Sequence, residues 1–146
     1  MPQIKKIICA IDLSQHSEFV ARYAYECAKA FKAELTFVYA APALTQYVGF
    51  HVPPTSIENF VKEIIAGAEE SMKEFLKSCP AEIEAKGAVL HGYAADEILN
   101  FAGSSGADLV IMGTHGRKGI DRILFGSVAE RVVKAATIPV MTVRPS

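Results

Sequence analysis

Hydrophobic and polar positions along the chain follow two alternating periods. Short, nearly continuous apolar runs are typical of strands covered on both faces. They occupy Ile4 to Ile11, Glu34 to Ala40, Ile83 to His91 with Gly87 as a possible bulge, Asp108 to Met112 and Val140 to Val143. Between them, apolar residues recur with the spacing of an amphipathic helix. The predicted helices are Ser14 to Phe31, Ile57 to Cys79, Ala94 to Ala102 and Ser127 to Ala136.

The order of these elements, β-α-β-α-β-α-β-α-β, predicts an α/β fold. Right-handed crossovers return each strand parallel to its neighbour, so we expect an open doubly wound five-stranded parallel sheet with helices on both faces. A chain of 146 residues suits one domain, here residues 1–146. The longest predicted connection, Ala41 to Ser56, has two open interpretations: packing across the molecule, or a lid or partner surface.

Composition and charge exclude several classes of protein. The 15 basic and 16 acidic residues nearly balance, so no long-range field favours nucleic acid or anionic lipid. No apolar run is long enough to span a membrane, and the first residues lack a signal-peptide pattern, so we expect a cytoplasmic protein.

The cysteines and histidines show no metal-site spacing. Cys9, Cys27 and Cys79 fall at apolar positions and are expected to be core or near-core thiols. The four histidines form neither H-x-x-x-H nor H-E-x-x-H, so a structural zinc centre is not expected.

Candidate chemistry gathers where the winding of the sheet would reverse. In open parallel sheets ligands bind outside the carboxyl ends of the strands at this point. If the reversal lies between the first and fourth strands, it brings together Asp12-Leu13-Ser14 and Gly113-Thr114-His115-Gly116. Two glycines allow backbone N–H groups to face one concavity, and Gly126-Ser127-Val128 opens a helix whose N-terminus attracts anions. We therefore expect a phosphate to bind here.

Structural roles are open for several of these residues. Ser127 to Glu130 also reads as an S-x-x-E capping box, and Asp12 could serve only as a cap or turn residue. Arg117, Lys118 and Arg122 could form a solvated loop face or bind polyphosphate. Capping does not explain the glycines Gly113, Gly116, Gly119 and Gly126. The P-loop, the dinucleotide fingerprint and the Gly-x-Ser-x-Gly elbow are all absent.

The pattern Gly113-x2-Gly116-x9-Gly126-Ser127, followed by Ile138-Pro139-Val140, resembles the ATP-binding branch of the universal stress protein family. The resemblance covers the whole chain, because Ile8 to Ser14 is similar to the first strand and D-x-S turn of the family and His91 to Ile98 to its third-strand-to-helix turn. Leu13 stands where the usual first turn, D-G-S, has glycine.

The resemblance implies ATP as the ligand, with Mg²⁺ or Mn²⁺. It implies that Asp12 lies near the ribose and phosphates and helps to hold the metal ion, and that the backbone of Val38 faces the adenine. On the same basis Met112 and Gly113 face the ribose. The residues expected to line the phosphates are Gly116, Arg117, Gly126, Ser127 and Val128. The implied strand order is 3-2-1-4-5.

Three functions are compatible with the sequence. The first is an ATP-binding stress or signalling module with little or slow hydrolysis, acting on an unidentified protein partner. Slow turnover is expected because His115 and Asp12 are the only candidate bases. The second is an ATP hydrolase or another adenine-nucleotide enzyme, and the third a nucleotide-free adaptor. The apolar edge strand and the resemblance both indicate a homodimer joined along Ile138 to Val143.

Overall fold

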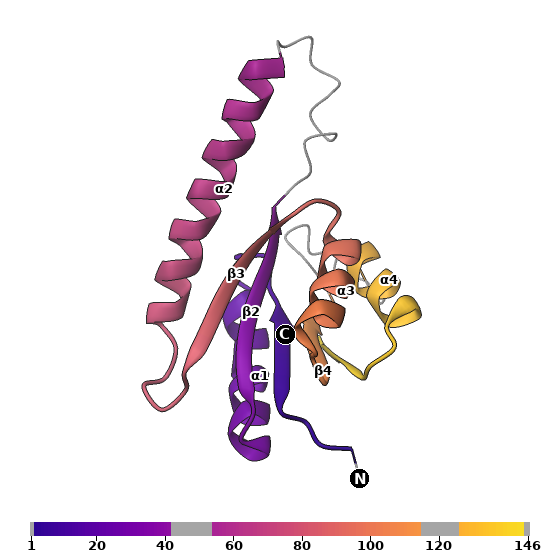
Figure 1. Ribbon diagram of the computed structural model, residues 1–146. Coiled ribbons are helices and arrows are strands. Elements are labelled where there is room, and N and C mark those ends of the chain that lie inside the picture. The colour runs from indigo at the N-terminus through magenta and orange to yellow at the C-terminus, as the bar shows by residue number, and fades with distance from the viewer. Residues whose placement is uncertain (1, 42–53, 115–125, 145–146) are drawn as a thin grey trace.

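The computed structural model of the chain describes residues 2–41, 54–114 and 126–144 (Figure 1). Strands and helices alternate along the described chain. The strands are β1 (Lys6–Ala10), β2 (Glu34–Ala41), β3 (Ala85–His91), β4 (Leu109–Gly113) and β5 (Val140–Val143). The helices are α1 (Ser17–Phe31), α2 (Pro54–Lys77), α3 (Ala94–Ser105) and α4 (Ser127–Ala135).

The five strands form one parallel sheet in the order β3-β2-β1-β4-β5, which confirms the predicted fold. Strand β1 lies at its centre and pairs with β2 on one side and with β4 on the other. In this register Ala10 stands opposite both Val38 and Met112. The winding therefore reverses between β1 and β4, as the sequence predicts.

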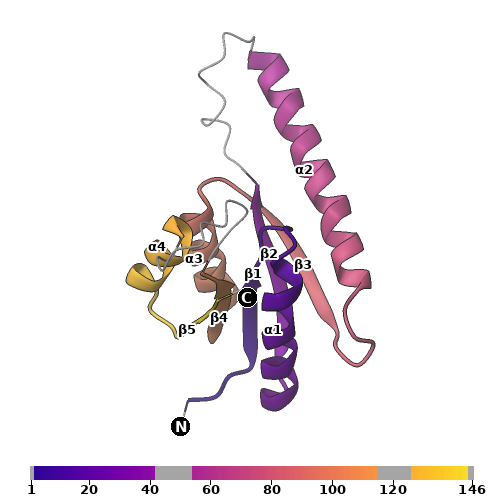
Figure 2. The same cartoon turned by 180° about the vertical axis from the view of Figure 1, so that it is seen from behind.

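Helices cover both faces of the sheet, and each face has its own apolar core (Figures 1 and 2). Successive side chains of a strand point to opposite faces. Ile7 and Cys9 of β1 therefore pack with α1 and α2, while Ile8 and Ala10 pack with α3 and α4. This double coverage explains why the strands read as continuous apolar runs, and it makes their side chains some of the most buried in the protein.

Gly87 allows α2 to approach β3 closely. The sequence suggested a bulge at this glycine, and that interpretation is wrong, because β2 and β3 pair in unbroken register with Phe37 opposite Gly87. A Cβ atom at position 87 would lie 2.5 Å from Cγ of Met72 and 3.0 Å from Cδ1 of Leu76. The absence of a side chain therefore serves the packing of the helix.

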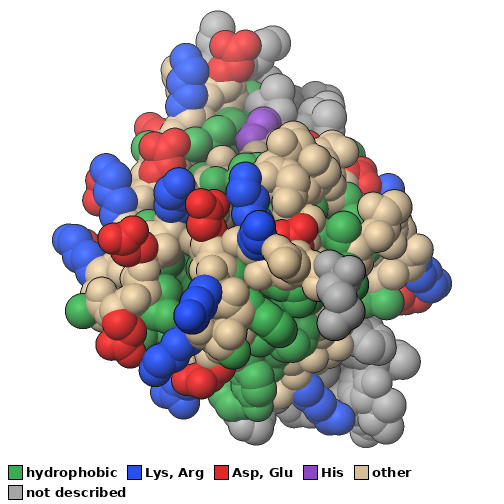
Figure 3. Space-filling view, turned by 60° about the horizontal axis from the view of Figure 1, so that its bottom comes forward, with side chains coloured by type: hydrophobic (Ala, Val, Ile, Leu, Met, Phe, Trp, Pro, Cys, Tyr) green, Lys and Arg blue, Asp and Glu red, His purple; other side chains and the backbone are tan. Residues whose placement is uncertain are grey.

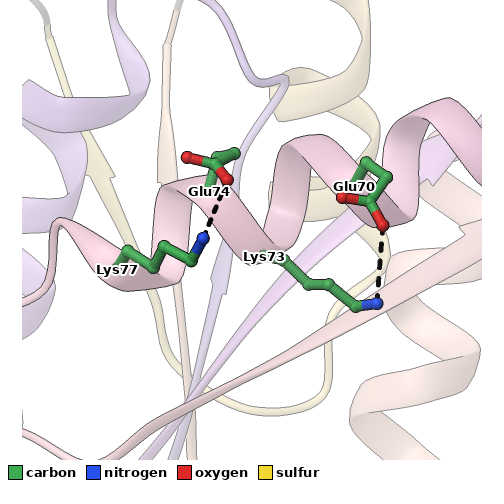
Figure 4. Close-up of polar contacts among 4 residues, drawn as sticks. All are labelled: Glu70, Lys73, Glu74 and Lys77. Atoms are coloured by element: carbon green, nitrogen blue, oxygen red, sulfur yellow. Dashed lines mark hydrogen bonds and ion pairs between the residues drawn. The ribbon is translucent and has the colours of Figure 1, made fainter.

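The outer face of α2 carries charged side chains that pair along the helix (Figure 4). The Nζ atom of Lys77 lies 3.0 Å from Oε1 of Glu74, and that of Lys73 lies 3.6 Å from Oε1 of Glu70. All four side chains are largely exposed, so water and salt screen both pairs and each contributes little to the stability of the helix.

The amino edge of the sheet, where the strands begin, is closed by hydrogen bonds. Helices α1 and α3 end in left-handed residues, Lys32 and Gly106, after which backbone N–H groups return to helical carbonyls. Oδ2 of Asp108 accepts hydrogen bonds from the amides of Lys5 at 2.9 Å and Lys6 at 3.0 Å. These two bonds lower the pKa of the Asp108 carboxyl below its ordinary value.

The surface and the cysteines bear on the sequence predictions. Basic and acidic side chains are interspersed over the face shown in Figure 3, so neither sign forms a continuous field there.

Cys9 is buried and Cys27 and Cys79 are partly buried, all three as free thiols, which agrees with the prediction of core or near-core positions. Burial raises the pKa of the Cys9 thiol well above its ordinary value. The described helices include none that is long and apolar enough to cross a membrane.

Candidate functional site

Asp12 follows β1 at the carboxyl edge of the sheet and connects the strand to α1. Its Oδ1 atom accepts hydrogen bonds from the Ser14 amide at 2.9 Å and from Oγ of Ser17 at 3.1 Å. Ser17 is the first residue of α1 and is almost fully buried. An aspartate that bonds the backbone two residues onward forms a local turn. The structure therefore gives Asp12 a turn role that holds its carboxylate at this edge, and its role toward a ligand stays a prediction.

Leu13 adopts a backbone conformation that normally belongs to glycine. Its φ angle of 60° lies in the left-handed region, where a side chain costs roughly 1–2 kcal/mol. Two contacts oppose this cost: the Asp12–Ser14 hydrogen bond closes the turn, and the partly buried Leu13 side chain packs against the core under α1. The chain thus keeps the glycine-type turn geometry with a leucine in place.

The start of α4 packs directly against the end of β4. The amide of Gly126 donates to the carbonyl of Thr114 at 2.6 Å, and the Thr114 amide donates to Val143 at 2.9 Å. A Cβ atom on Gly126 would lie 3.2 Å from the Thr114 carbonyl oxygen, closer than ordinary contact. Because φ of Gly126 is −58°, this glycine serves close approach and not a left-handed turn.

The capping-box interpretation of Ser127 and Glu130 is wrong. Gly126 is the N-cap of α4, no side chain caps the helix, and Ser127 is its exposed first residue. Oε1 of Glu130 accepts a hydrogen bond from Nζ of Lys134 at 2.9 Å, one turn onward. The Glu130 amide makes the first helical bond, to the Gly126 carbonyl. By helix geometry, the three preceding amides, those of Ser127, Val128 and Ala129, have no helical acceptor.

These groups share one edge of the sheet. Since Ala10 pairs with Met112, the Asp12 turn lies beside Gly113 and Thr114, and the Thr114 carbonyl binds the start of α4. Asp12, Gly113, Gly126 and Val128 are partly exposed along this edge, whereas the Met112 side chain is buried in the core under α3 and α4. The predicted site residues Gly116 and Arg117 lie outside the described residues, as do His115, Lys118, Gly119 and Arg122.

Val38 lies within β2, three residues before the strand ends at Ala41. Its side chain is fully buried, and its carbonyl accepts a hydrogen bond from the Ile11 amide at 2.9 Å. Its backbone carbonyl is therefore already engaged by the chain that follows β1.

Ala40 offers the backbone groups that the sequence analysis did not identify. Bonds from Glu34 to Lys5 and from Ile11 to Val38 show that even-numbered residues of β2 direct their backbone groups toward β1. Ala40 has the same phase but lies beyond the end of β1, and within the described residues no backbone group bonds to that side of it. The only sequence signal is that the apolar run of β2 continues further than that of β1.

The carboxyl edge therefore presents three kinds of group. The amides and the positive end of the α4 dipole suit an anion, the Ala40 backbone suits a planar group with a donor and an acceptor, and the Asp12 carboxylate suits a hydroxyl or a cation. The described residues include no group of three or more His, Cys, Asp or Glu side chains able to hold a metal ion. Two surface hollows of about 230 and 500 Å³ lie elsewhere, between α1 and the segment after α2, where both are lined by Lys29, Glu82 and Ile83.

Comparison with known proteins identifies close relatives along the whole chain. The universal stress protein family model matches residues 3–144. Universal stress protein MJ0531 of Methanocaldococcus jannaschii is 37% identical over 145 residues, which cover 96% of this chain and 82% of that protein. The structure of universal stress protein UspA from Lactobacillus plantarum superposes with a TM-score of 0.82 at 20% identity, covering 97% of this chain and 99% of that one.

Two further structures of the same fold contain a nucleotide. A universal stress protein in complex with cAMP has a TM-score of 0.63 and 21% identity, with 99% of each chain covered. The universal stress protein from Archaeoglobus fulgidus in complex with dAMP has a TM-score of 0.56 and 22% identity, with 97% of this chain and 98% of that one covered. At these identities the likeness establishes a shared fold.

Proposed function

The chain belongs to the universal stress protein family, and on that premise we propose that it binds ATP at the carboxyl edge of its sheet. Bound ATP makes the protein a nucleotide-dependent stress or signalling module. The observation that carries this proposal is the contact between Gly126 and Thr114, which aligns the start of α4 with the Asp12 turn.

The phosphates bind at the start of α4 in this proposal. Gly126 uses its own amide to bond Thr114, which leaves the amides of Ser127, Val128 and Ala129 as donors next to the positive end of the helix dipole. Such an N-terminus is a general phosphate site. Gly116 and Arg117, which the sequence assigns to the phosphates, complete this part of the site, and Met112 and Gly113 contribute backbone beside the ribose.

The adenine binds where β2 extends past β1. The Ala40 N–H and C=O provide one donor and one acceptor at adjacent positions, which matches the edge of an adenine ring. The sequence assigned this role to Val38, whose carbonyl bonds Ile11, and we transfer the backbone contacts to Ala40. The relatives in complex with cAMP and dAMP support an adenine nucleotide as the ligand class.

A divalent cation can bind at this edge if the Asp12 carboxylate and the phosphates of the nucleotide hold it together. Mg²⁺ is commonly held by one or two carboxylates together with phosphates and water. Asp12 supplies one carboxylate, whose Oδ1 is bonded to Ser14 and Ser17. We therefore propose that Mg²⁺ or Mn²⁺ enters with the nucleotide, and that the ion reduces the repulsion between Asp12 and the phosphates.

The cellular setting is proposed on the same premise. We propose that residues 1–146 form one nucleotide-binding domain, that the protein is cytoplasmic, and that two copies join along Ile138 to Val143. The output then passes to a protein partner through a change in the shape of the dimer or of its exposed surface.

The test compares two aspartates with similar bonding at opposite edges of the sheet. Asp12→Asn keeps an oxygen that can accept the Ser14 and Ser17 hydrogen bonds but removes the charge. Asp108→Asn makes the same change where the carboxylate accepts two backbone bonds at the amino edge. Calorimetric titration with ATP and Mg²⁺ should show an affinity loss of about tenfold or more for Asp12→Asn, and no loss for Asp108→Asn.

Two results would contradict the proposal. The wild-type protein could fail to bind ATP, both in the titration and as co-purified nucleotide in native mass spectrometry. Alternatively, folded Asp12→Asn could bind ATP and Mg²⁺ as tightly as wild type, which would leave Asp12 with its turn role alone.

A further inference from the structure

Helices α3 and α4 lie side by side on one face of the sheet, and an ion pair joins them near their starts (Figures 1 and 2). Nη2 of Arg131 in α4 lies 2.8 Å from Oδ1 of Asp96 in α3. Asp96 belongs to the first turn of α3. Because the helices of a parallel α/β fold start at the carboxyl edge of the sheet, this ion pair lies on the same edge as the Asp12 turn.

The side chain of Arg131 lies on the flank of α4 that also carries Ser127. Helical residues four apart lie one above another, and these two residues are the fifth and the first of α4. Helical side chains lean toward the N-terminus, so the arginine covers the turn that precedes it. That turn rises only about 6 Å. The guanidinium therefore lies within reach of the space in front of the first amides of α4, which have no helical acceptor.

The ion pair is exposed enough to exchange partners. The side chains of Arg131 and Asp96 keep 64% and 42% of their accessibility. An exposed pair adds little to the stability of a fold, because water screens the charges and both side chains lose rotamer freedom. A guanidinium binds phosphate oxygens with two parallel hydrogen bonds, as it does a carboxylate. A polyphosphate at the start of α4 can therefore compete with Asp96 for Arg131.

Lys134 provides a comparison within the same helix. Its Nζ atom lies 2.9 Å from Oε1 of Glu130, so it pairs along its own helix and not with α3. Lys134 belongs to the last turn of α4, away from the amides without acceptors. The two cations carry the same charge, but only Arg131 is held by a neighbouring helix near the carboxyl edge.

We propose that Arg131 makes the site selective for a nucleoside triphosphate over a monophosphate, and that Asp96 is the anion that competes with the added phosphates. The inference rests on the proposed ATP site and deepens it. The α4 amides suffice for a single phosphate group, whereas the further negative charge of a triphosphate calls for a cation. Arg131 supplies that cation when the phosphates displace Asp96 from its guanidinium.

The experiment measures the affinity for ATP and for AMP by calorimetric titration, with Mg²⁺ present in both. Arg131→Gln should lower ATP affinity about tenfold and leave AMP affinity unchanged. Asp96→Asn should raise ATP affinity about threefold, because it releases the guanidinium and removes a negative charge near the phosphates. Most of this gain should disappear in the double variant, since the competition requires Arg131.

Lys134→Gln is the matched control, because it removes the same charge from the same helix. It should change neither affinity. A loss of ATP affinity equal to that of Arg131→Gln would show general charge attraction and would overturn the role of Arg131.

The opposite signs of the two single variants separate phosphate binding from a structural link between the helices. A structural link loses the same contact in either variant. If Arg131→Gln and Asp96→Asn both weakened ATP and AMP binding equally, this inference would be overturned while the proposed ATP site would stand. A wild-type protein that binds neither nucleotide would overturn the proposed function and this inference with it.

Discussion

Each edge of the sheet has an aspartate that accepts hydrogen bonds, but Asp108 at the amino edge and Asp12 at the carboxyl edge have different roles. At the amino edge Asp108 accepts the amides of Lys5 and Lys6 and joins two segments of chain into a closed surface. At the carboxyl edge Asp12 accepts hydrogen bonds from the Ser14 amide and the Ser17 hydroxyl, both within the local turn that connects β1 to α1. Each carboxylate accepts at least two hydrogen bonds, from distant segments at the amino edge and from its own turn at the carboxyl edge.

The difference follows from the direction of the chain. Every helix of a parallel α/β fold starts near the carboxyl edge and ends near the amino edge. The helix ends at Lys32 and Gly106 satisfy their carbonyls with returning amides. At the start of α4, the Gly126 amide bonds the Thr114 carbonyl, and the amides of Ser127, Val128 and Ala129 have no helical acceptor. We therefore expect anions to bind at the carboxyl edge and not at the amino edge. The substitutions below test this difference between the two edges.

The largest effect is expected from a carboxylate at the start of α4. Ser127→Glu places negative charge where the phosphates are proposed to bind, and it should weaken ATP binding by about 2 kcal/mol, or about 30-fold. The same charge favours the helix dipole, so the melting temperature should stay equal or rise. Titration and thermal unfolding of one variant thus separate binding from folding.

The control for Ser127→Glu adds the same charge elsewhere. Asn100→Glu changes an exposed position of α3 and should not alter ATP affinity. Equal affinity in the two variants would place the phosphates away from α4.

A smaller effect is expected at the strained turn. Leu13→Gly and Leu13→Ala both remove the packing of the leucine side chain, but only glycine relieves the left-handed backbone. Leu13→Gly should therefore be more stable than Leu13→Ala by about 1 kcal/mol, the reverse of the usual order. Urea unfolding measures the difference. An alanine variant as stable as the glycine variant would show that the turn is not strained.

The closed edge should give a modest dependence on pH. The pKa of Asp108 is lowered in the folded protein by the bonds from Lys5 and Lys6. Its stabilising contribution is therefore present above the pKa of the unfolded state, about 3.9, and is lost as pH falls through the lower folded pKa. The stability difference between wild type and Asp108→Asn should shrink as urea unfolding is moved from pH 7 to pH 3. A difference that stays constant over this range would contradict the assignment.

The smallest effect is expected from Ser127→Ala. A capping serine would contribute about 1 kcal/mol. Since Ser127 is an exposed first residue of the helix without a capping bond, its replacement should change unfolding by less than about 0.5 kcal/mol. A loss near 1 kcal/mol would restore the capping-box interpretation.

Sequence reasoning succeeded where local periodicity reports burial. Strand β5 was predicted with its observed ends, Val140 and Val143, because Pro139 and Arg144 mark the two limits of the apolar run. Helix α2 was predicted, although it begins earlier, at Pro54. The reversal between β1 and β4, which places Asp12 beside Gly113, was assumed in the sequence analysis and agrees with the strand order that the resemblance to the family implied.

It failed where the outcome depends on contacts between distant segments. Gly87 was interpreted as a bulge because the approach of Met72 cannot be read from its neighbours in sequence. Ser127 matched a capping motif, but the bond from Gly126 to Thr114 made Gly126 the cap. The assignment of Val38 as the backbone contact of a ligand stays a prediction; among the described residues, no backbone group bonds Ala40 on the side of β1, because β2 continues past β1.

By itself, the sequence determined the α/β fold and the edge of the sheet that carries the glycines, because these follow from burial periods and chain direction, whereas the strand order was what the resemblance to the family implied. Only the tertiary structure decided which backbone groups at that edge have no bond to the described residues, and that Cys27 of α1 lies next to Met141 of β5. Periodicity along a chain records which side of an element is buried, whereas an unsatisfied amide or an exposed stripe depends on which neighbour arrives and where that neighbour stops.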